Sequence, residues 1–276
     1  MNPHENDAQG VFVLPMPFII DGMEQLESVD LSRADFYKKL IGGSAVSTSQ
    51  PSVGEVSEFW TNILKEYDEI IHIPTSSNLS ASFATAKNLA EDFDGKVHVV
   101  DNHRLSVALK SSVFDAVKLR DEGKTAEEIV QTLEAMGGDY AVYFSIETME
   151  YLKKGGRISP AAATIGTILK LRPVLRLSEN GLVKHTIAKS MLKAKMTMKE
   201  AIKNDLNGAF KEYADKGEMM LVCVYGNDLE TAKAFEEEIK TAFPNVPFLY
   251  DDPMSLSIAC HTGPGVVSVG CVRVLK

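Results

Sequence analysis

Short apolar runs alternate with segments of helical spacing through the first half of the chain. Two short buried strands are predicted at Glu69–Pro74 and Lys96–Asp101. Between them, Leu79–Asp92 has apolar side chains at the spacing of one helix face. This half also contains predicted helices at Leu105–Arg120 and after Thr125, where a capping box with Glu128 occurs, and a predicted strand at Tyr140–Ile146. Such strand–helix–strand alternation predicts a parallel sheet covered on both faces.

The pattern changes near Gly155–Gly156. Two apolar runs, Pro173–Leu177 and Leu182–Ile187, flank an Asn-Gly turn and predict an antiparallel hairpin. The elements expected after the hairpin are a long basic helix, a strand at Met219–Tyr225, a helix from Leu229, a strand near Phe248 and a last strand at Val266–Leu275. We therefore predict an α/β fold of two domains, residues 1–150 with a mainly parallel sheet and residues 151–276 with a mixed sheet.

Composition is that of an ordinary globular protein, with 276 residues of which 45% are hydrophobic and 24% are charged. No apolar run approaches the roughly 20 residues that span a bilayer, and Val11–Ile20 is interrupted by Pro15 and Pro17. The first residues lack the basic and apolar segments of a secretory signal. We expect a cytoplasmic protein without stable membrane insertion. Three cysteines in apolar surroundings are expected to be free thiols: Cys223, Cys260 and Cys271.

Charge is distributed unevenly along the chain. The net charge is −9, yet residues 153–203 contain twelve Lys or Arg residues and only two Glu, so that this basic segment carries +10. Such a run is either a solvated helix face or a docking surface for an acidic or phosphate-bearing partner, and both interpretations stay open. A nucleic-acid partner is not expected, because the whole chain is acidic and no nucleic-acid-binding motif accompanies the segment.

Several motifs of catalysis and cofactor binding are absent. Gly123–Thr125 resembles the end of a phosphate-binding loop, but Lys118 stands where that loop requires its first glycine. The glycines near Gly263 lack the spacing and the following helix of a dinucleotide site. No Gly-x-Ser-x-Gly sequence occurs, and the six histidines show no metal-ligand spacing. We expect neither a cofactor nor a metal.

Polar residues gather in the loop that follows the first predicted strand. Ser76, Ser77 and Asn78 precede a predicted helix, where free backbone N–H groups and side-chain donors suit a carboxylate or a phosphate. Plain helix capping is the alternative interpretation. Ser47–Ser52 is a second hydroxyl-rich loop before a predicted helix, and it has the same alternative.

Two further motifs combine glycine with a cationic or ionisable side chain. In His261–Gly265, Gly263 and Gly265 permit close backbone approach, and the histidine can donate a hydrogen bond to an anion. A structural histidine is the alternative. Tyr151–Ser159 places paired glycines and Arg157 at the predicted domain junction, where a helix C-cap with a solvated arginine is the alternative.

Taken together and in this order, these segments resemble the DegV family of fatty-acid-binding proteins. The resemblance spans nearly the whole chain, and its motifs are Thr48–Ser52, Ser76–Ser80, Leu152–Ser159, Leu171–Leu175 and His261–Gly265. It implies two α/β domains with a long-chain fatty acid buried between them. It also implies that Thr48, Ser76 or Ser77, and His261 bind the carboxylate.

The resemblance further implies a partner. Proteins of this family are carriers that present the bound acid to a separate ATP-dependent fatty-acid kinase, which makes an acyl-phosphate for phospholipid synthesis. Arg157, Arg172 and Arg176 of the basic segment then become candidates for kinase docking or phosphate contact, with Asn78, Gly263 and Gly265 as further candidate contacts. No catalytic residue is expected on this chain.

Two departures from the family pattern bear on the pocket. The usual opening strand with Thr-Asp-Ser is missing, and the usual Leu-Ser-Gly-Thr-Tyr is replaced by a sequence with Ala81 and Phe83. The pocket is therefore expected to differ in shape. An alternative function is a serine-dependent lipid hydrolase or acyltransferase, with Ser77 as nucleophile and His261 as base, oriented by a nearby aspartate such as Asp251 or Asp252.

Overall fold

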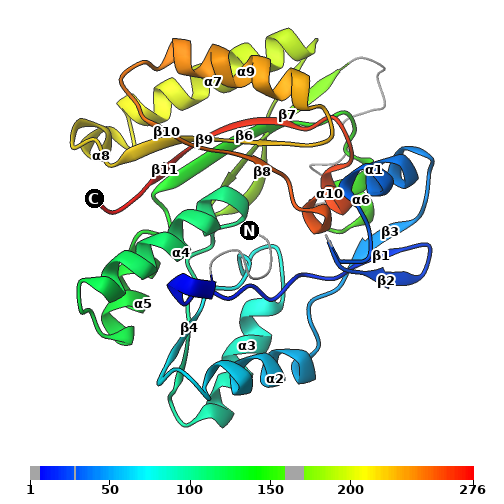
Figure 1. Cartoon of the computed structure of the whole chain (residues 1–276). Helices are drawn as coiled ribbons and strands as arrows, with labels where there is room; N and C mark the ends of the chain where they lie inside the picture. The colour runs from blue at the N-terminus through cyan, green and yellow to red at the C-terminus, as the bar shows by residue number, and fades with distance from the viewer. Residues whose placement is uncertain (1–6, 28, 159–170) are drawn as a thin grey trace.

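A six-stranded mixed sheet forms the larger layer of the molecule. The computed structural model describes residues 7–27, 29–158 and 171–276 (Figure 1). The strand order is β10-β9-β11-β6-β7-β8, and only β10 and β9 are parallel. The strands are β6 (Tyr140–Ser145), β7 (Arg172–Ser178), β8 (Gly181–Ala188), β9 (Met219–Tyr225), β10 (Phe248–Pro253) and β11 (Val267–Arg273).

Helices cover both faces of this sheet. On one face pack α7 (Met191–Asn207) and α9 (Leu229–Ala242), which bury Met198 and Phe235 against the strands. On the opposite face, α4 (Ser106–Asp121) packs Val107 and Ala108 against side chains of β6, β7 and β9. The short helix α8 (Lys211–Asp215) lies near the C-terminus of the chain. Because successive strand residues alternate between faces, each central strand supplies two cores.

A parallel pair, β4 (Ile70–His72) and β5 (Val97–Val99), forms the second layer. Its apolar core is centred on the fully buried Trp60 of α2. The helices around the pair are α2 (Val53–Ile63), α3 (Ser82–Ala90) and α5 (Ala126–Ala135), with a 3-10 turn, η2, at Glu91–Phe93.

A small antiparallel sheet completes the fold, with the order β2-β1-β3. Phe18 and Phe36 are fully buried between this sheet and α1, with their rings at 89°. The elements are η1 (Asp7–Gln9), β1 (Phe18–Ile20), β2 (Met23–Gln25), α1 (Arg33–Ile41), β3 (Val46–Thr48), α6 (Glu150–Lys154) and α10 (Leu256–Thr262). Helix α10 contacts β3 and α6, so that a late segment of the chain lies beside an early one and a central one.

The predicted α/β fold is confirmed, including the parallel pair, the mixed sheet and the hairpin of β7 and β8. The expectation that Tyr140–Ile146 extends the parallel sheet is wrong: β6 is antiparallel to both β7 and β11 within the large sheet. All six residues of β6 are buried, and only a central place in a sheet covered on both faces buries a strand so completely. A boundary near residue 150 stays a prediction, although β6 hydrogen bonds only with later strands among the described residues.

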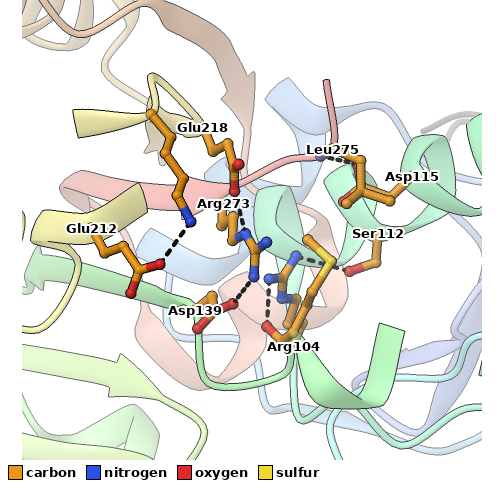
Figure 2. A network of polar contacts seen from close by, with 10 residues as sticks. Arg104, Ser112, Asp115, Asp139, Glu212, Glu218, Arg273 and Leu275 are labelled. Atoms are coloured by element: carbon orange, nitrogen blue, oxygen red, sulfur yellow. Dashed lines mark hydrogen bonds and ion pairs between the residues drawn. The ribbon is translucent and has the colours of Figure 1, made fainter. Parts of the chain in front are cut away.

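Hydrogen bonds of buried polar groups lie within the helical layer and between it and the C-terminal residues (Figure 2). The fully buried Arg104 donates to Ser112 Oγ at 3.1 Å and to the carbonyl oxygen of Met136 at 2.7 Å. Asp115 of α4 accepts a hydrogen bond from the backbone N–H of Leu275 at 2.8 Å. The Asp115 bond ties α4 to the C-terminal residues, whereas the Arg104 bonds tie the loop before α4 to that helix and to the end of α5.

Candidate functional site

A cavity of about 880 Å³ lies between the α4-covered face of the large sheet and the smaller layers. This volume lies within the range of about 300–1,000 Å³ that is typical of small-molecule sites. Its walls are mostly apolar, and the side chains that form them include Phe12, Leu14, Phe59, Trp60, Ile63, Leu79, Leu105, Val113, Val142, Phe144, Leu177, Met254 and Ile258. An elongated apolar ligand would therefore contact both layers.

A hydroxyl and an imidazole meet on the wall of this cavity. Thr48 Oγ1 lies 2.8 Å from His261 Nε2, within hydrogen-bond distance. Thr48 is the last residue of β3 and His261 lies in the last turn of α10, and these two elements pack together. Both residues were predicted from separate motifs, and the fold brings them together across 213 positions of sequence.

Burial keeps the His261 imidazole neutral at neutral pH. Loss of hydration, followed by the positive charge of Arg157, lowers the pKa of His261 to about 4. Its Nδ1 atom is buried without a hydrogen-bond partner among the described residues. A side chain at Gly155 would overlap His261 Nδ1, so that the glycine of the paired motif is needed to seat the ring.

Arg157 supplies a positive charge to the same part of the cavity wall. Its Nη1 donates to the carbonyl oxygen of Gly155 at 2.6 Å, and its Nε donates to the carbonyl oxygen of Leu79 at 3.2 Å. These two bonds fix the guanidinium beside the α6 C-terminus, and Arg157 lines the cavity. The polar end of the cavity, defined by Thr48, His261 and Arg157, thus combines a hydroxyl, a neutral imidazole and a cation.

The serine-rich loop holds Ser76, Ser77 and Asn78 outside the cavity wall. Ser76 is buried, and its hydroxyl has no hydrogen-bond partner among the described residues. Ser77 Oγ lies 3.0 Å from His103 Nδ1, and Asn78 donates to the carbonyl oxygen of Glu179 at 2.6 Å. None of these three lines the cavity, so their contact with a carboxylate stays a prediction.

The cavity-lining part of this loop is the next four residues. Leu79, Ser80, Ala81 and Ser82 line the cavity, and α3 begins at Ser82 rather than near Leu79. The α3 N-cap, Ala81, makes no side-chain capping bond, but Ser80 Oγ accepts a hydrogen bond from the backbone N–H of Ser82 at 3.2 Å. Sequence reasoning missed Ser80 and Ser82, although they belong to the same hydroxyl-rich run.

Gly263 and Gly265 pack against the α6 region rather than line the cavity. Both have positive φ, at 75° and 70°, which favours glycine. A side chain at Gly263 would overlap the ring of Tyr151, and one at Gly265 would lie 2.6 Å from Glu147 Oε1. The two glycines thus allow the loop after α10 to approach α6 and hold His261 in place.

Arg172 and Arg176 lie on β7 and do not line the cavity. Arg172 Nη1 pairs with Glu147 Oε1 at 3.2 Å, and the Arg176 guanidinium lies 6.0 Å from the Tyr143 ring centroid. Alternation along β7 puts both on the face of Val174, which packs against α7, whereas Leu177 lines the cavity. Neither arginine is therefore placed to contact a ligand in the cavity.

The described residues do not assemble the alternative hydrolase site. Asp251 pairs with Lys233 at 2.6 Å and Asp252 with Lys110 at 2.7 Å, so neither orients His261. Ser77 meets a different histidine, His103. There the serine and Asp101 approach the same ring nitrogen, at 3.0 and 3.1 Å, whereas a serine–histidine–aspartate triad uses both nitrogens.

The described part of the chain contains neither a candidate metal site nor a candidate membrane-spanning helix. Over residues 7–27, 29–158 and 171–276, no group of three or more His, Cys, Asp or Glu side chains could hold a metal ion. In those same ranges, no helix is both long and apolar enough to cross a bilayer.

The fold and the cavity define an α/β protein that can enclose an elongated apolar molecule with a polar end. A family model described as "uncharacterised protein, DegV family" matches residues 1–274. The chain therefore belongs to the DegV family, which confirms the resemblance seen in its motifs.

Two curated relatives illustrate the extent of the match. A DegV domain-containing protein of Listeria monocytogenes is 27% identical over 262 residues, covering 93% of this chain and 89% of that protein. Another, from Deinococcus radiodurans, is 32% identical over 176 residues, which are 63% of each chain.

Solved structures of similar fold include proteins described by their ligand. A DegV family protein from Thermus thermophilus, described as binding fatty acid, has a TM-score of 0.82 and 28% identity, covering 99% of this chain and 96% of that chain. The fatty-acid-binding DegV of Bacillus subtilis has a TM-score of 0.82 and 26% identity, with 97% and 93% covered. A stearic-acid-binding protein from Eubacterium ventriosum, at 21% identity and a TM-score of 0.86 over 97% and 93% of the chains, shows the shared fold.

Proposed function

We propose that this protein binds one long-chain fatty acid in the cavity, with the carboxylate at the polar end formed by Thr48, His261 and Arg157. The observation that carries the proposal is the hydrogen-bonded pair of Thr48 and His261 on the wall of an otherwise mostly apolar cavity. The fatty-acid-binding structures from Thermus thermophilus and Bacillus subtilis support the same ligand class.

Affinity for such a ligand comes from its tail. Burial of a dozen methylene groups contributes roughly 10 kcal/mol before ordering costs, at about 0.8 kcal/mol each. A carboxylate exchanges hydrogen bonds with water for hydrogen bonds with protein, and the net gain is only about 1 kcal/mol per bond. The polar end therefore orients the acid more than it retains it, while Arg157 offsets the buried negative charge.

The experiment is mass spectrometry of lipid that copurifies with the protein under native conditions. We expect one fatty acid per chain in the wild type. Thr48→Ala should still retain the acid, and Ser47→Ala, at the exposed neighbouring position of β3, is the matched control. A cavity free of lipid, together with no binding of added stearate or oleate, would contradict the proposal.

We further propose that the protein is a carrier and not an enzyme, and that it presents the bound carboxylate to a separate ATP-dependent fatty-acid kinase. Because ATP is the phosphoryl donor, this role belongs in the cytoplasm. Changes at the polar end should then reduce phosphorylation more than lipid retention. We expect Thr48→Ala to lower acyl-phosphate formation in a kinase-coupled assay while copurified lipid persists.

The docking surface for the kinase is proposed to lie on the basic segment. Arg172 is the better candidate of the two arginines of β7. The Nε atom of Arg176 is buried and its guanidinium lies over the Tyr143 ring, which indicates a structural role for Arg176. Reversing the charge of Arg172 should impair coupling without loss of lipid, with exposed Lys193→Glu as a comparison within the same basic segment. Loss of lipid in Arg172→Glu would contradict a docking role.

A fluorophosphonate probe addresses the rival function directly. The carrier proposal expects no covalent labelling of Ser77, because its hydroxyl meets a histidine that has no separate carboxylate on its second ring nitrogen among the described residues. Specific labelling that disappears in Ser77→Ala would instead support a hydrolase or acyltransferase.

A further inference from the structure

Among the described residues that line the cavity, His72 is the histidine outside the polar end, and its surroundings differ from those of His261. It is the last residue of β4 and borders the cavity in a half-buried position. Its neighbours on the wall include Trp60 and Ile63 of α2, which belong to the apolar core around β4 and β5. No element that carries His72 or Trp60 contributes to the pair of Thr48 and His261.

The Trp60 indole lies against this imidazole, and its N–H indicates the tautomer of the ring. The indole Nε1–H of Trp60 points to His72 Nδ1 at 3.4 Å, with the ring centroids 5.2 Å apart and the planes at 73°. An indole N–H can only donate, so His72 Nδ1 accepts and the ring proton lies on Nε2 in the tautomer assigned by this bond. Burial lowers the pKa of His72 to about 4, which keeps the ring neutral at neutral pH.

The Nε2–H of His72 is then a hydrogen-bond donor without a partner among the described residues. Some other polar side chains on the cavity wall are already hydrogen bonded and are not available in this way. Gln50 and Thr85 hydrogen bond to each other at 2.9 Å, and Lys110 pairs with Asp252 at 2.7 Å. The donor of His72 is thus available to whatever fills the apolar part of the cavity.

A plain acyl chain would displace water from this donor and offer no hydrogen-bond acceptor in its place. A chain that carries an oxygen atom at the right position would accept the hydrogen bond and avoid that cost. We propose that the cavity prefers fatty acids with a hydroxyl or keto oxygen within the acyl chain, received by His72 Nε2–H. This inference rests on the proposed function, since it names the class of fatty acid that the same cavity takes.

The test is a comparison of affinities for stearate, 10-hydroxystearate and 12-hydroxystearate, measured by displacement of a fluorescent fatty acid from delipidated protein. We expect the wild type to bind at least one hydroxy acid about ten-fold or more tightly than stearate, which corresponds to a difference of about 1.4 kcal/mol. His72→Phe, which keeps a planar ring but has no donor, should abolish that preference. His72→Gln, which keeps a terminal N–H donor, should retain much of it.

Ile73→Val is the matched control, because Ile73 also lines the cavity from the adjacent position but has no polar group. It should change the affinities for all three acids together and leave their ratio unchanged. Thermal unfolding of each ligand-free variant reports whether loss of the Trp60 contact affects folding. The ratio of the affinities for hydroxystearate and stearate does not change if a fraction of the protein is inactive.

Two results would overturn the inference: equal or weaker binding of both hydroxy acids in the wild type, or an unchanged preference in His72→Phe. Either result with tight stearate binding leaves the proposed function intact. Failure of all three acids to bind would instead remove the proposed function and this inference together.

Discussion

At the scale of single residues, the candidate site depends on what stands next to His261. The ring is placed by a hydroxyl on one side and by the absence of a side chain at Gly155 on the other. A glycine motif that reads from the sequence as a helix C-cap thus also has a packing role. That role becomes visible only when α6 and α10 are brought together.

Gly155→Ala should displace His261 from Thr48, because the added methyl group overlaps the imidazole. We expect a loss of about 1–3 kcal/mol in the free energy of unfolding and weaker retention of copurified lipid. Urea denaturation measures the first effect. In the double variant with His261→Ala the overlap is relieved, so the two losses should not add.

Gly54→Ala is the control for Gly155→Ala. Gly54 lies in α2, and an added methyl group there meets no atom within 4 Å. Its stability should be unchanged or slightly raised. A loss in Gly54→Ala equal to that in Gly155→Ala would contradict the proposed overlap.

The depressed pKa of His261 predicts how stability depends on pH. Above pH 6.5 the ring is neutral in both folded and unfolded chains and contributes nothing to the dependence. As pH falls from 6.5 towards about 4, the unfolded chain binds a proton that the folded chain refuses, so the free energy of unfolding decreases. Removing the group by His261→Gln should therefore make the protein less sensitive to acid.

Denaturant unfolding at pH 7 and pH 5 checks this dependence. We expect the wild type to lose about 1–2 kcal/mol more than His261→Gln between these pH values. Identical losses in the two proteins would show that the folded ring titrates normally. His98→Gln is a histidine control, because His98 is partly exposed and lies within hydrogen-bond distance of Glu69.

At the scale of elements, the segment between η1 and β1 forms part of the cavity wall although it has no regular secondary structure. Residues 10–16 line the cavity along their whole length, and the segment passes from the side of α4 to the small antiparallel sheet (Figure 1). Arg120 Nη1 donates to the carbonyl oxygen of Gln9 at 2.6 Å, which anchors one end. This segment forms one side of the pocket.

Phe12→Ala should weaken this wall. The Phe12 ring packs edge-to-face on Tyr67, with centroids 5.5 Å apart, and both side chains line the cavity. We expect a fluorescent fatty acid to dissociate several-fold faster, because part of its apolar contact is lost. Stopped-flow transfer to lipid vesicles measures the rate, and an unchanged rate would show that ligand exit does not involve this wall.

At the scale of the whole molecule, charged side chains join segments that are far apart in sequence. Arg273 of β11 pairs with Asp139 at 2.9 Å and with Glu218 at 2.7 Å (Figure 2). Its guanidinium also lies 4.0 Å from the Tyr213 ring centroid. These pairs hold the last strand to the residues that immediately precede β6 and β9. Since β11 lies between these two strands, the contacts fix the centre of the large sheet.

Arg273→Met should destabilise the protein by about 1–3 kcal/mol, because it leaves two partly buried carboxylates without their cation. Lys211→Met is the matched control, since Lys211 makes an exposed pair with Asp215 that contributes little. Chemical denaturation of both variants measures the difference. Equal stability of the two variants would contradict a structural role for Arg273.

The sequence by itself determined the α/β class, the hairpin of β7 and β8, and the family, because periodicity and ordered motifs are local properties. It also identified Thr48 and His261 separately. Only the tertiary structure decided that these two residues meet, that Ser77 meets His103 instead, and that β6 belongs to the large sheet. Contacts between distant segments depend on strand order and helix packing, which no single stretch of sequence encodes.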